Sequence, residues 1–374
     1  MKKNSVLLVA IIIAIPVLFF IFQNQFKKPV SKELYIYNWS DYLAEGVIED
    51  FENEFGIDVT YDVFDSNEVL EAKLLAGNSG YDIVVPSGAF LANQIKAGIF
   101  QKLDKNILPN LSNLDPAILE YTGKHDPDNA YSVNWLYGTT GIGYNIDMIE
   151  ERMPGATEDG TVDSLDILFN PDLISKFADC GVAILDAPTE VVEIALHYMG
   201  YDPNTEDQQE NQNTLEMLKK IRPYVKYFDS SQYIDDLANG EICLALGWSG
   251  DVFLASDEAA EGINVWYSVP SEGTVIWFDQ MAIPADAKNV ENAHKFINYY
   301  MRPEVVAANT NYVWYPNANL VANTTPGLID QEILDDPAVY ADEETMAKLF
   351  PDQADTPQKS RISTQIFNDF KTAN

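Results

Sequence analysis

Residues 34–42 read Leu-Tyr-Ile-Tyr-Asn-Trp-Ser-Asp-Tyr. The alternating aliphatic and aromatic side chains at the start of this segment predict a β-strand, and a helical pattern follows directly. The ring of Trp39, the hydroxyl of Ser40 and the carboxyl of Asp41 therefore stand where a strand gives way to a helix. In open α/β sheets, ligands bind at such strand ends. A core strand followed by a polar helix cap would contain the same residues, so this segment alone leaves its function open.

The segments that follow repeat this order of strand and helix. Asp65 and Glu68 have the spacing of a capping box at the start of a helix. Ser87 and Gly88 follow a strand as Trp39 and Ser40 do, although a plain turn would also contain them. A β-α-β-α-β-α order predicts a parallel sheet with helices on both faces. After the first strand, we expect strands at 57–64 and 81–85, helices at 43–55, 69–76 and 90–97, and a loop-like stretch at 101–129.

A long strand predicted at 131–144 leads into a second α/β region. Its glycines and threonines suit a strand that leaves one sheet and enters another, and we place this crossover near 137–141. Glu190 and the segment Trp248 to Asp251 again lie where a predicted strand ends and a predicted helix begins. We expect strands at 182–185, 242–247, 265–269 and 275–283, a polar insert at 204–213, and helices beginning at Pro188, Leu215, Ser230, Val252 and Ala293.

Charge and composition limit the possible partners. The 374 residues carry 58 acidic and 23 basic side chains, for a net charge of −35. Nucleic acid is excluded as a partner because phosphate binding needs positive charge. A cationic ligand would be steered toward such a surface, but an acidic surface adapted to high salt would have the same composition. The length allows two domains, each with its own core.

The amino-terminal segment 1–30 is predicted to lie outside the fold. Lysines flank an apolar run at 6–22, which is typical of an export signal or a membrane anchor. In either case the chain from residue 31 onward lies outside the cytoplasm. Cys180 and Cys243 are then a candidate disulfide, because exported proteins meet an oxidising environment. Two buried free thiols are the alternative.

The sequence lacks the motifs that several kinds of binding site or active site require. The three histidines have no metal-ligand spacing to one another or to a cysteine, so we expect neither a metal nor a cofactor. There is no Gly-rich phosphate loop and no Gly-x-Ser-x-Gly nucleophile elbow. Carboxylates and aromatic rings remain. Paired carboxylates could hydrolyse a glycosidic bond, whereas carboxylates beside several tryptophans suit an organic cation.

Eight segments resemble the polyamine-binding proteins of bacterial ABC transporters, and most of all those that bind putrescine. The resemblance extends over residues 33–370 and includes both cysteines. The segments are 37–42 (Tyr-Asn-Trp-Ser-Asp-Tyr), 64–68 (Phe-Asp-Ser-Asn-Glu), 82–87 (Asp-Ile-Val-Val-Pro-Ser), 124–129 (Lys-His-Asp-Pro-Asp-Asn), 185–188 (Leu-Asp-Ala-Pro), 230–234 (Ser-Ser-Gln-Tyr-Ile), 247–252 (Gly-Trp-Ser-Gly-Asp-Val) and 315–319 (Tyr-Pro-Asn-Ala-Asn).

The resemblance implies an α/β fold of the type II periplasmic binding proteins, with two lobes that close around a ligand. Each lobe would be a mainly parallel sheet flanked by helices. We expect residues 31–137 and 276–325 in the first lobe, and residues 138–275 and 326–374 in the second. The lobes would rotate about crossover strands near 137–141 and 269–275.

The resemblance also implies a role for individual residues. Ser40 and Asp279 would hold one ammonium group of a diamine, with Asp41 close by, and Glu190 and Asp251 would hold the other. Trp277 departs from the putrescine binders, which usually have Phe there, and Thr189 stands where an acidic residue is common. The remaining members of the expected site line the cleft or pack on the methylene chain: Trp39, Tyr42, Ser87, Trp248 and Tyr315.

The predicted function is therefore capture of putrescine in the periplasm and delivery to an inner-membrane ABC permease, by a monomer that is not an enzyme. A spermidine or broad diamine binder and a polyamine sensor subunit are the alternatives within this class. An extracytoplasmic glycosidase or aminohydrolase is the alternative from another class. A tether to the inner membrane through residues 6–22 is a further expectation.

Overall fold

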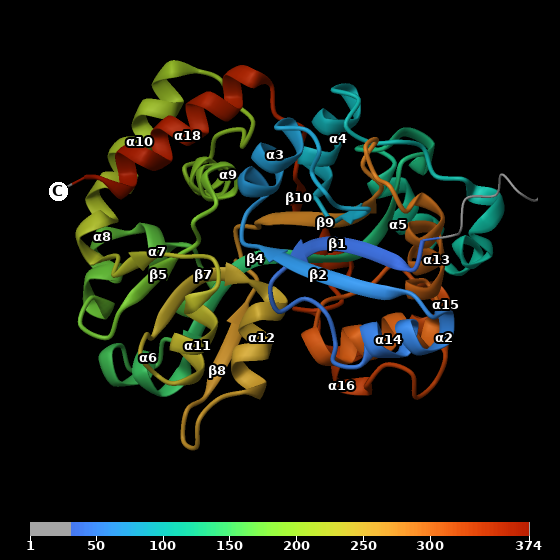
Figure 1. Ribbon diagram of the computed structural model, residues 1–374. Coiled ribbons are helices and arrows are strands. Elements are labelled where there is room, and N and C mark those ends of the chain that lie inside the picture. Colours follow the sequence, from blue (N-terminus) through green and yellow to red (C-terminus); the bar gives the residue numbers. More distant parts are fainter. Residues whose placement is uncertain (1–30, 374) are drawn as a thin grey trace, which may run out of the picture.

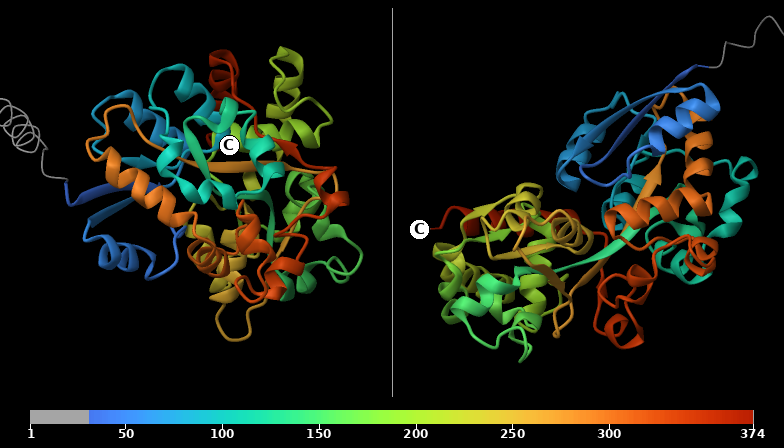
Figure 2. Two further views of the ribbon diagram at one scale, coloured as in Figure 1. Left: turned by 90° about the vertical axis from the view of Figure 1, so that its right-hand side faces the viewer. Right: turned by 90° about the horizontal axis from the view of Figure 1, so that it is seen from below.

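The computed structural model describes residues 31–373 and shows two α/β lobes (Figures 1 and 2). The amino-terminal part alternates strand and helix as expected. The strand β1 (Glu33–Trp39) pairs in parallel with both β2 (Asp58–Phe64) and β3 (Ile83–Val84). The connecting helices are α2 (Val47–Phe55), α3 (Asn67–Leu75) and α4 (Gly88–Lys96). We call the part that contains β1 to β3 the first lobe.

The long strand β4 (Ser132–Asn145) joins the two lobes. Up to Thr139 it pairs with β9 (Val275–Ala282), and from Thr140 onward it pairs with β7 (Leu244–Trp248). The change of partner falls inside the segment where we expected the crossover. The strand order is β2-β1-β3-β9-β4-β7-β5-β6, with β8 (Val265–Ser268) beside β4 and β10 (Phe350–Pro351) beside β9.

The second lobe contains the strands β5 to β8, and its strand ends face those of the first. The strands β5 (Val182–Ile184), β6 (Tyr227–Phe228) and β7 run parallel. Its principal helices are α9 (Pro188–Tyr198), α10 (Gln208–Ile221), α11 (Gln232–Ala238) and α12 (Ser249–Asp257). The shorter helices are α6 (Ile146–Arg152), α7 (Asp166–Phe169) and α8 (Pro171–Ile174).

The carboxyl-terminal segment contacts both lobes. Helix α18 (Pro357–Lys371) packs on α9 and α10 of the second lobe. Residues 328–330, by contrast, lie against the first lobe, because the side chain of Asn311 donates to the carbonyl of Leu328 and accepts from the amide of Asp330, both at 3.0 Å. We expected all of 326–374 in the second lobe, and this division of the chain stays a prediction. The helices in this part of the chain are α13 (Val290–Tyr300), α14 (Pro303–Val313), α15 (Leu320–Thr324), α16 (Gln331–Asp335) and α17 (Glu343–Met346).

Three local predictions were wrong. The cap of α3 is Ser66, whose side chain accepts from the amide of Val69, rather than Asp65. The polar insert is largely the first half of α10, which Asp207 caps by accepting from the amides of the first turn. The stretch 101–129 contains α5 (Pro116–Thr122), which begins with Pro directly after the Asp115 cap. In each case a polar residue caps the start of the helix.

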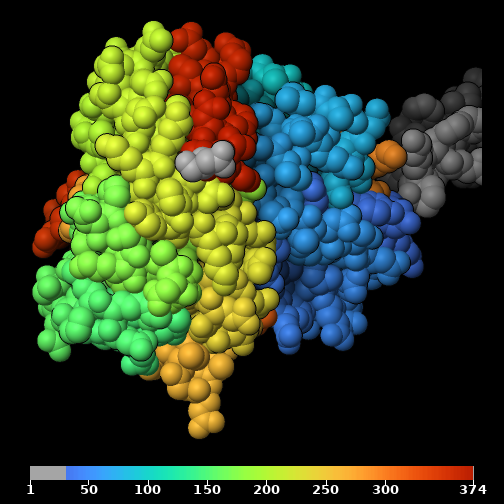
Figure 3. Space-filling model, turned by 90° about the vertical axis from the view of Figure 1, so that its left-hand side faces the viewer, coloured from blue at the N-terminus to red at the C-terminus, as the bar shows by residue number. Residues whose placement is uncertain are grey.

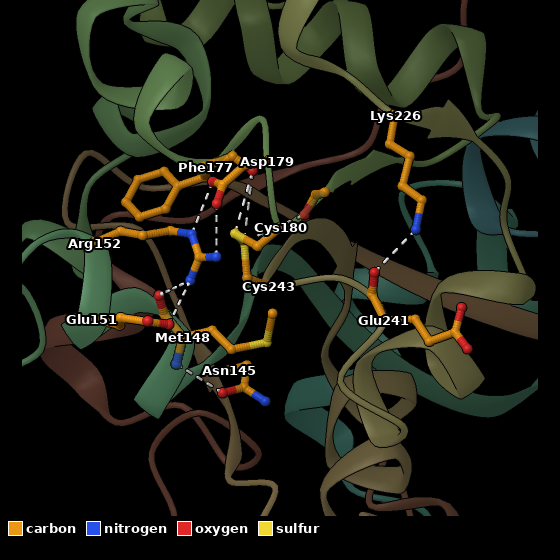
Figure 4. Close-up of a disulfide and its surroundings, with 11 residues drawn as sticks. Asn145, Met148, Glu151, Arg152, Phe177, Asp179, Cys180, Lys226, Glu241 and Cys243 are labelled. Carbon is orange, nitrogen blue, oxygen red and sulfur yellow. Dashed lines mark hydrogen bonds and ion pairs between the residues drawn. A yellow bond between two sulfur atoms is a disulfide. The ribbon is translucent and has the colours of Figure 1, made fainter.

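Cys180 and Cys243 form a disulfide, as expected (Figure 4). It joins the start of β5 to the start of β7, where the amide of Cys243 also donates to the carbonyl of Gly181 at 3.1 Å. Both sulfur atoms are buried within the second lobe. The bridge therefore stabilises the lobe itself and lies away from the facing strand ends.

The predictions for the export signal or anchor at 1–30 and for the apolar run at 6–22 lie outside the described residues. In the part from residue 31 to residue 373, no helix has the length and apolar character needed to cross a membrane.

Candidate functional site

The facing strand ends enclose a cavity between the lobes. Its accessible volume is about 70 Å³, which suits a small or slender ligand. The first lobe supplies residues that follow β1 and β3, the second lobe supplies residues that follow β5 and β7, and β9 passes along the back. Ten of the eleven residues predicted for the site line this cavity: Trp39, Ser40, Tyr42, Ser87, Glu190, Trp248, Asp251, Trp277, Asp279 and Tyr315.

Asp41 does not line the cavity. The residue is exposed and has a φ of 50°, a left-handed conformation that Asp tolerates better than most residues. This turn directs the chain from β1 toward α2. The resemblance implied a place for Asp41 close to one ammonium group, and its neighbours Ser40 and Tyr42 do line the cavity.

Asp279 is one of three carboxylates that the structure surrounds with hydrogen-bond donors. It lies on β9 with 3% of its surface exposed, and Ser87 Oγ donates to its Oδ1 at 2.6 Å. Asn67 fixes Ser87 by a pair of hydrogen bonds, both 3.0 Å long. Burial raises the pKa of Asp279 to about 8, and the hydroxyl of Ser87 partly offsets this effect.

Asp251 lies in the first turn of α12 and accepts from two tyrosines. Tyr233 OH donates to its Oδ2 at 2.8 Å, and Tyr315 OH donates to its Oδ1 at 2.7 Å. Burial raises the pKa of Asp251 to about 7 despite these donors. Gly250 is required here, since a Cβ at that position would lie 2.3 Å from the ring of Tyr315.

Glu190 lies in the first turn of α9 and completes this group. Trp248 Nε1 donates to its two oxygens at 3.1 and 3.2 Å, and the hydroxyl of Thr140 also donates to it. Trp277 Nε1 in turn donates to Thr140 Oγ1 at 3.1 Å, so the tryptophans orient the acid. Burial raises the pKa of Glu190 to about 7.

Aromatic rings form the walls between these carboxylates. Trp39 and Trp248 come from opposite lobes and meet edge to face, with their ring centroids 5.5 Å apart. Trp277 and Tyr315 lie 5.4 Å apart, and Tyr42 meets Tyr315 at 5.0 Å. Such faces pack well on methylene groups and attract cations.

Residues of the two lobes contact each other beside the cavity. Ser40 of the first lobe and Ser231 of the second lie 3.3 Å apart, and both hydroxyls donate to Asp65 Oδ1, at 3.2 and 3.3 Å. In Figure 3 the yellow segment of the second lobe adjoins the blue segment of the first. The lobes therefore touch at the rim of the cavity, and a ligand inside would be removed from bulk water.

Sequence reasoning missed several polar residues of the cavity. Glu68 lies in the first turn of α3, and burial raises its pKa to about 7. Glu193 follows Glu190 by one helical turn, and this spacing could have revealed it. Asp352 comes from the carboxyl-terminal segment and gave no signal in the sequence. The cavity thus contains at least six carboxyl groups, and none of the lining residues in the described part of the chain is Lys or Arg.

A cavity of this kind can bind an elongated organic cation. The carboxylates provide the negative charge that ammonium groups need, and the rings between them cover the hydrocarbon part. Burial raises the pKa of Asp279, Asp251, Glu190 and Glu68, and a bound ammonium group would counteract this effect.

Comparisons with known proteins agree with this geometry. The sequence model of a family described as bacterial extracellular solute-binding proteins matches residues 46–341. The putrescine-binding periplasmic protein PotF of Escherichia coli K12 is 48% identical over 346 residues, which cover 91% of this chain and 92% of PotF. The putrescine-binding periplasmic protein SpuD of Pseudomonas aeruginosa is 50% identical over 327 residues, with coverage of 86% and 88%.

A solved structure has the same fold. The spermidine/putrescine ABC transporter substrate-binding protein PotD of Streptococcus pneumoniae superposes with a TM-score of 0.73 at 29% identity, covering 92% of this chain and 99% of PotD. The two-lobed fold expected from the sequence is thus confirmed.

Proposed function

The chain belongs to the bacterial extracellular solute-binding proteins, and we propose that it captures putrescine in the periplasm and delivers it to an ABC permease. The observation that carries this proposal is the cavity with three hydrogen-bonded carboxylates and four large aromatic rings. The names of PotF and SpuD, both putrescine-binding proteins, support the choice of ligand. The protein would act as a monomer that binds and releases its ligand unchanged.

In this proposal the carboxylates bind the ammonium groups, and the aromatic rings pack on the methylene chain. Asp279, oriented by Ser87, holds one ammonium group near the first lobe, with Ser40 close by. Glu190 and Asp251, oriented by Trp248 and two tyrosines, hold the other. Trp39, Trp248, Trp277 and Tyr315 cover the methylene chain, with Tyr42 and Ser87 completing the lining. A carboxylate at each end sets the distance between the two positive groups.

Lobe closure would sequester the ligand and create the surface that a permease recognises. The strands β4 and β9 connect the lobes, so they are the expected hinge. Small-angle scattering measures the change, and the radius of gyration should fall when putrescine saturates the protein. An unchanged scattering profile at saturation would argue against closure about this hinge.

Calorimetric titration with putrescine, cadaverine, agmatine, spermidine and spermine tests the choice of ligand. We expect putrescine to bind most tightly and spermidine more weakly, because the indole of Trp277 narrows the cleft for longer amines. Tighter binding of spermidine would favour the spermidine-binding alternative. No heat with any of these amines would overturn the proposed function, and recovery of altered ligand after incubation would instead indicate an enzyme.

Residues 1–30 determine how the protein is held in the periplasm. We propose that they direct export and that, where they are retained, the apolar run at 6–22 tethers the protein to the inner membrane. The mass of the native protein distinguishes the two forms. A chain that starts near residues 25–32 has been cleaved, and an intact chain is anchored.

A further inference from the structure

The cavity continues beyond Glu190 along the same face of α9. Glu193 follows one helical turn later, lines the cavity and has 3% of its surface exposed. Its Oε1 atom has no hydrogen-bond partner within residues 31–373. A buried carboxylate without a donor is costly in a folded protein. This arrangement differs from that of Glu190, whose oxygens accept from Trp248 and Thr140.

Asp352 lines the same end of the cavity and is incompletely bonded. Its Oδ2 accepts from the amide of Ala89 at 3.0 Å, which orients the side chain. Its Oδ1 has no hydrogen bond in the described structure and lies 3.5 Å from Nε2 of His125, which bonds to the backbone carbonyl of Asp352 at 2.9 Å. Asp352 is thus a second buried carboxylate that lines the cavity and has an oxygen with no hydrogen-bond donor in the described structure.

The protein only partly neutralises this end. Lys359 of α18 is the nearby cation, and its ammonium counteracts the effect of burial on the pKa of Glu193 and of Asp355. Lys359 itself is buried and its Nζ has no hydrogen-bond partner in the described part of the chain. It does not line the cavity. The carboxyl groups of Glu193 and Asp355 therefore share one ammonium group, which leaves a deficit of positive charge.

We propose that Glu193, together with Asp352, forms a further subsite that takes the third ammonium group of a linear triamine. The proposal rests on the proposed function, because the first two ammonium groups of such a ligand occupy the diamine site. A diamine leaves this subsite empty. Spermidine reaches it with its terminal aminopropyl arm.

The spacing of the carboxylates fits such an arm. Residues three apart on a helix have Cβ atoms about 5–6 Å apart, so Glu190 and Glu193 present two carboxylates at roughly this separation. A propylene spacer joins two nitrogens through four bonds of about 1.5 Å each, which spans roughly 5 Å when extended. One nitrogen can thus contact Glu190 while the next contacts Glu193.

The test compares two ligands on one variant. In Glu193→Gln the side chain keeps its size but loses its charge. We expect the Kd for spermidine to rise by about tenfold or more, because a hydrogen bond to a charged group is lost, while the Kd for putrescine changes by less than about threefold. Glu216→Gln, on the exposed face of α10, is the matched control and should change neither value.

Asp352→Asn provides a second variant, since Asn can still accept from the amide of Ala89. It should weaken spermidine selectively in the same way. Equal weakening of both amines in both variants, or unchanged spermidine binding in both, would overturn the subsite while leaving the diamine site intact. An unmodified protein that binds neither amine would overturn the proposed function, and the subsite with it.

Discussion

Two groups of carboxylates in one cavity differ in how the fold prepares them. Asp279, Asp251 and Glu190 each accept from hydroxyl or indole donors that are themselves held in place. Glu193 and Asp352 each have a buried oxygen without any donor in the described structure. We propose that the first group, with its oxygens already oriented by these donors, binds the two ammonium groups of a diamine. The second group forms the proposed subsite for the third ammonium group of a triamine.

Removing a charge from the first group should have the largest effect on binding. We expect Asp279→Asn and Asp251→Asn each to weaken putrescine binding by at least about thirtyfold, because breaking a desolvated charge pair costs about 2–5 kcal/mol. Asp257→Asn, at the exposed end of α12, is the control and should bind as the unmodified protein does. Calorimetry measures all three, and unchanged affinity in both cavity variants would place the ammonium groups elsewhere.

Protonation of Asp279, Asp251 and Glu190 should make the affinity for putrescine depend on pH. Burial raises the pKa of Asp279 to about 8 and that of Asp251 and Glu190 to about 7. A bound ammonium stabilises the ionised carboxylates, so binding near pH 7 releases protons. Affinity for putrescine should therefore fall as the pH decreases from 8 to 6, by up to about tenfold per pH unit for each proton released.

Titrations in two buffers of different ionisation enthalpy measure the number of protons released. At pH 7 the observed binding enthalpy should differ between the buffers. Equal enthalpies, together with an affinity that is constant between pH 6 and pH 8, would show that these carboxyl groups are fully ionised before the ligand arrives.

Replacing Trp277, one of the aromatic rings that line the cavity, should change putrescine affinity less than removing one of these charges. Trp277→Phe keeps an aromatic face but removes the hydrogen bond from Nε1 to Thr140. We expect putrescine affinity to stay within about tenfold, and spermidine affinity to improve relative to putrescine because the cleft widens. A larger loss of putrescine affinity would mean that the main contribution of the indole is its hydrogen bond to Thr140, which orients Glu190. The packing of its aromatic face on the ligand would then contribute less.

The disulfide should leave binding nearly unchanged, because it lies within the second lobe and away from the cavity. The double variant Cys180→Ala, Cys243→Ala opens a loop of 63 positions. Its free energy of unfolding should fall by up to about 4 kcal/mol, measured by denaturant unfolding, while the Kd for putrescine changes by less than about threefold. A large loss of affinity in a variant that remains folded would show that the bridge also positions α9 or α12.

The sequence predicted the alternation of strands and helices, and the residues that line the cavity at the strand ends, better than it predicted the far end of the cavity. Trp39, Ser87 and Trp248 follow short apolar strands, and parallel strands bring such ends together. Glu193 resembles an ordinary acidic residue of an exposed helix, and only its packing against α18 buries it. Asp352 lies far along the chain in an acidic segment whose position depends on β10. Asp41, which we expected close to one ammonium group, lies in an exposed turn with a positive φ, and its role stays a prediction.

The central claim is that the cavity recognises two positive charges at a fixed separation. Titration of the unmodified protein with putrescine and with 1-butylamine, under the same conditions, tests it most directly. The two ligands have the same four-carbon chain and differ by one ammonium group. We predict that putrescine binds at least about thirtyfold more tightly, because butylamine leaves one buried carboxylate end unpaired. Equal affinity for the two amines would contradict the claim.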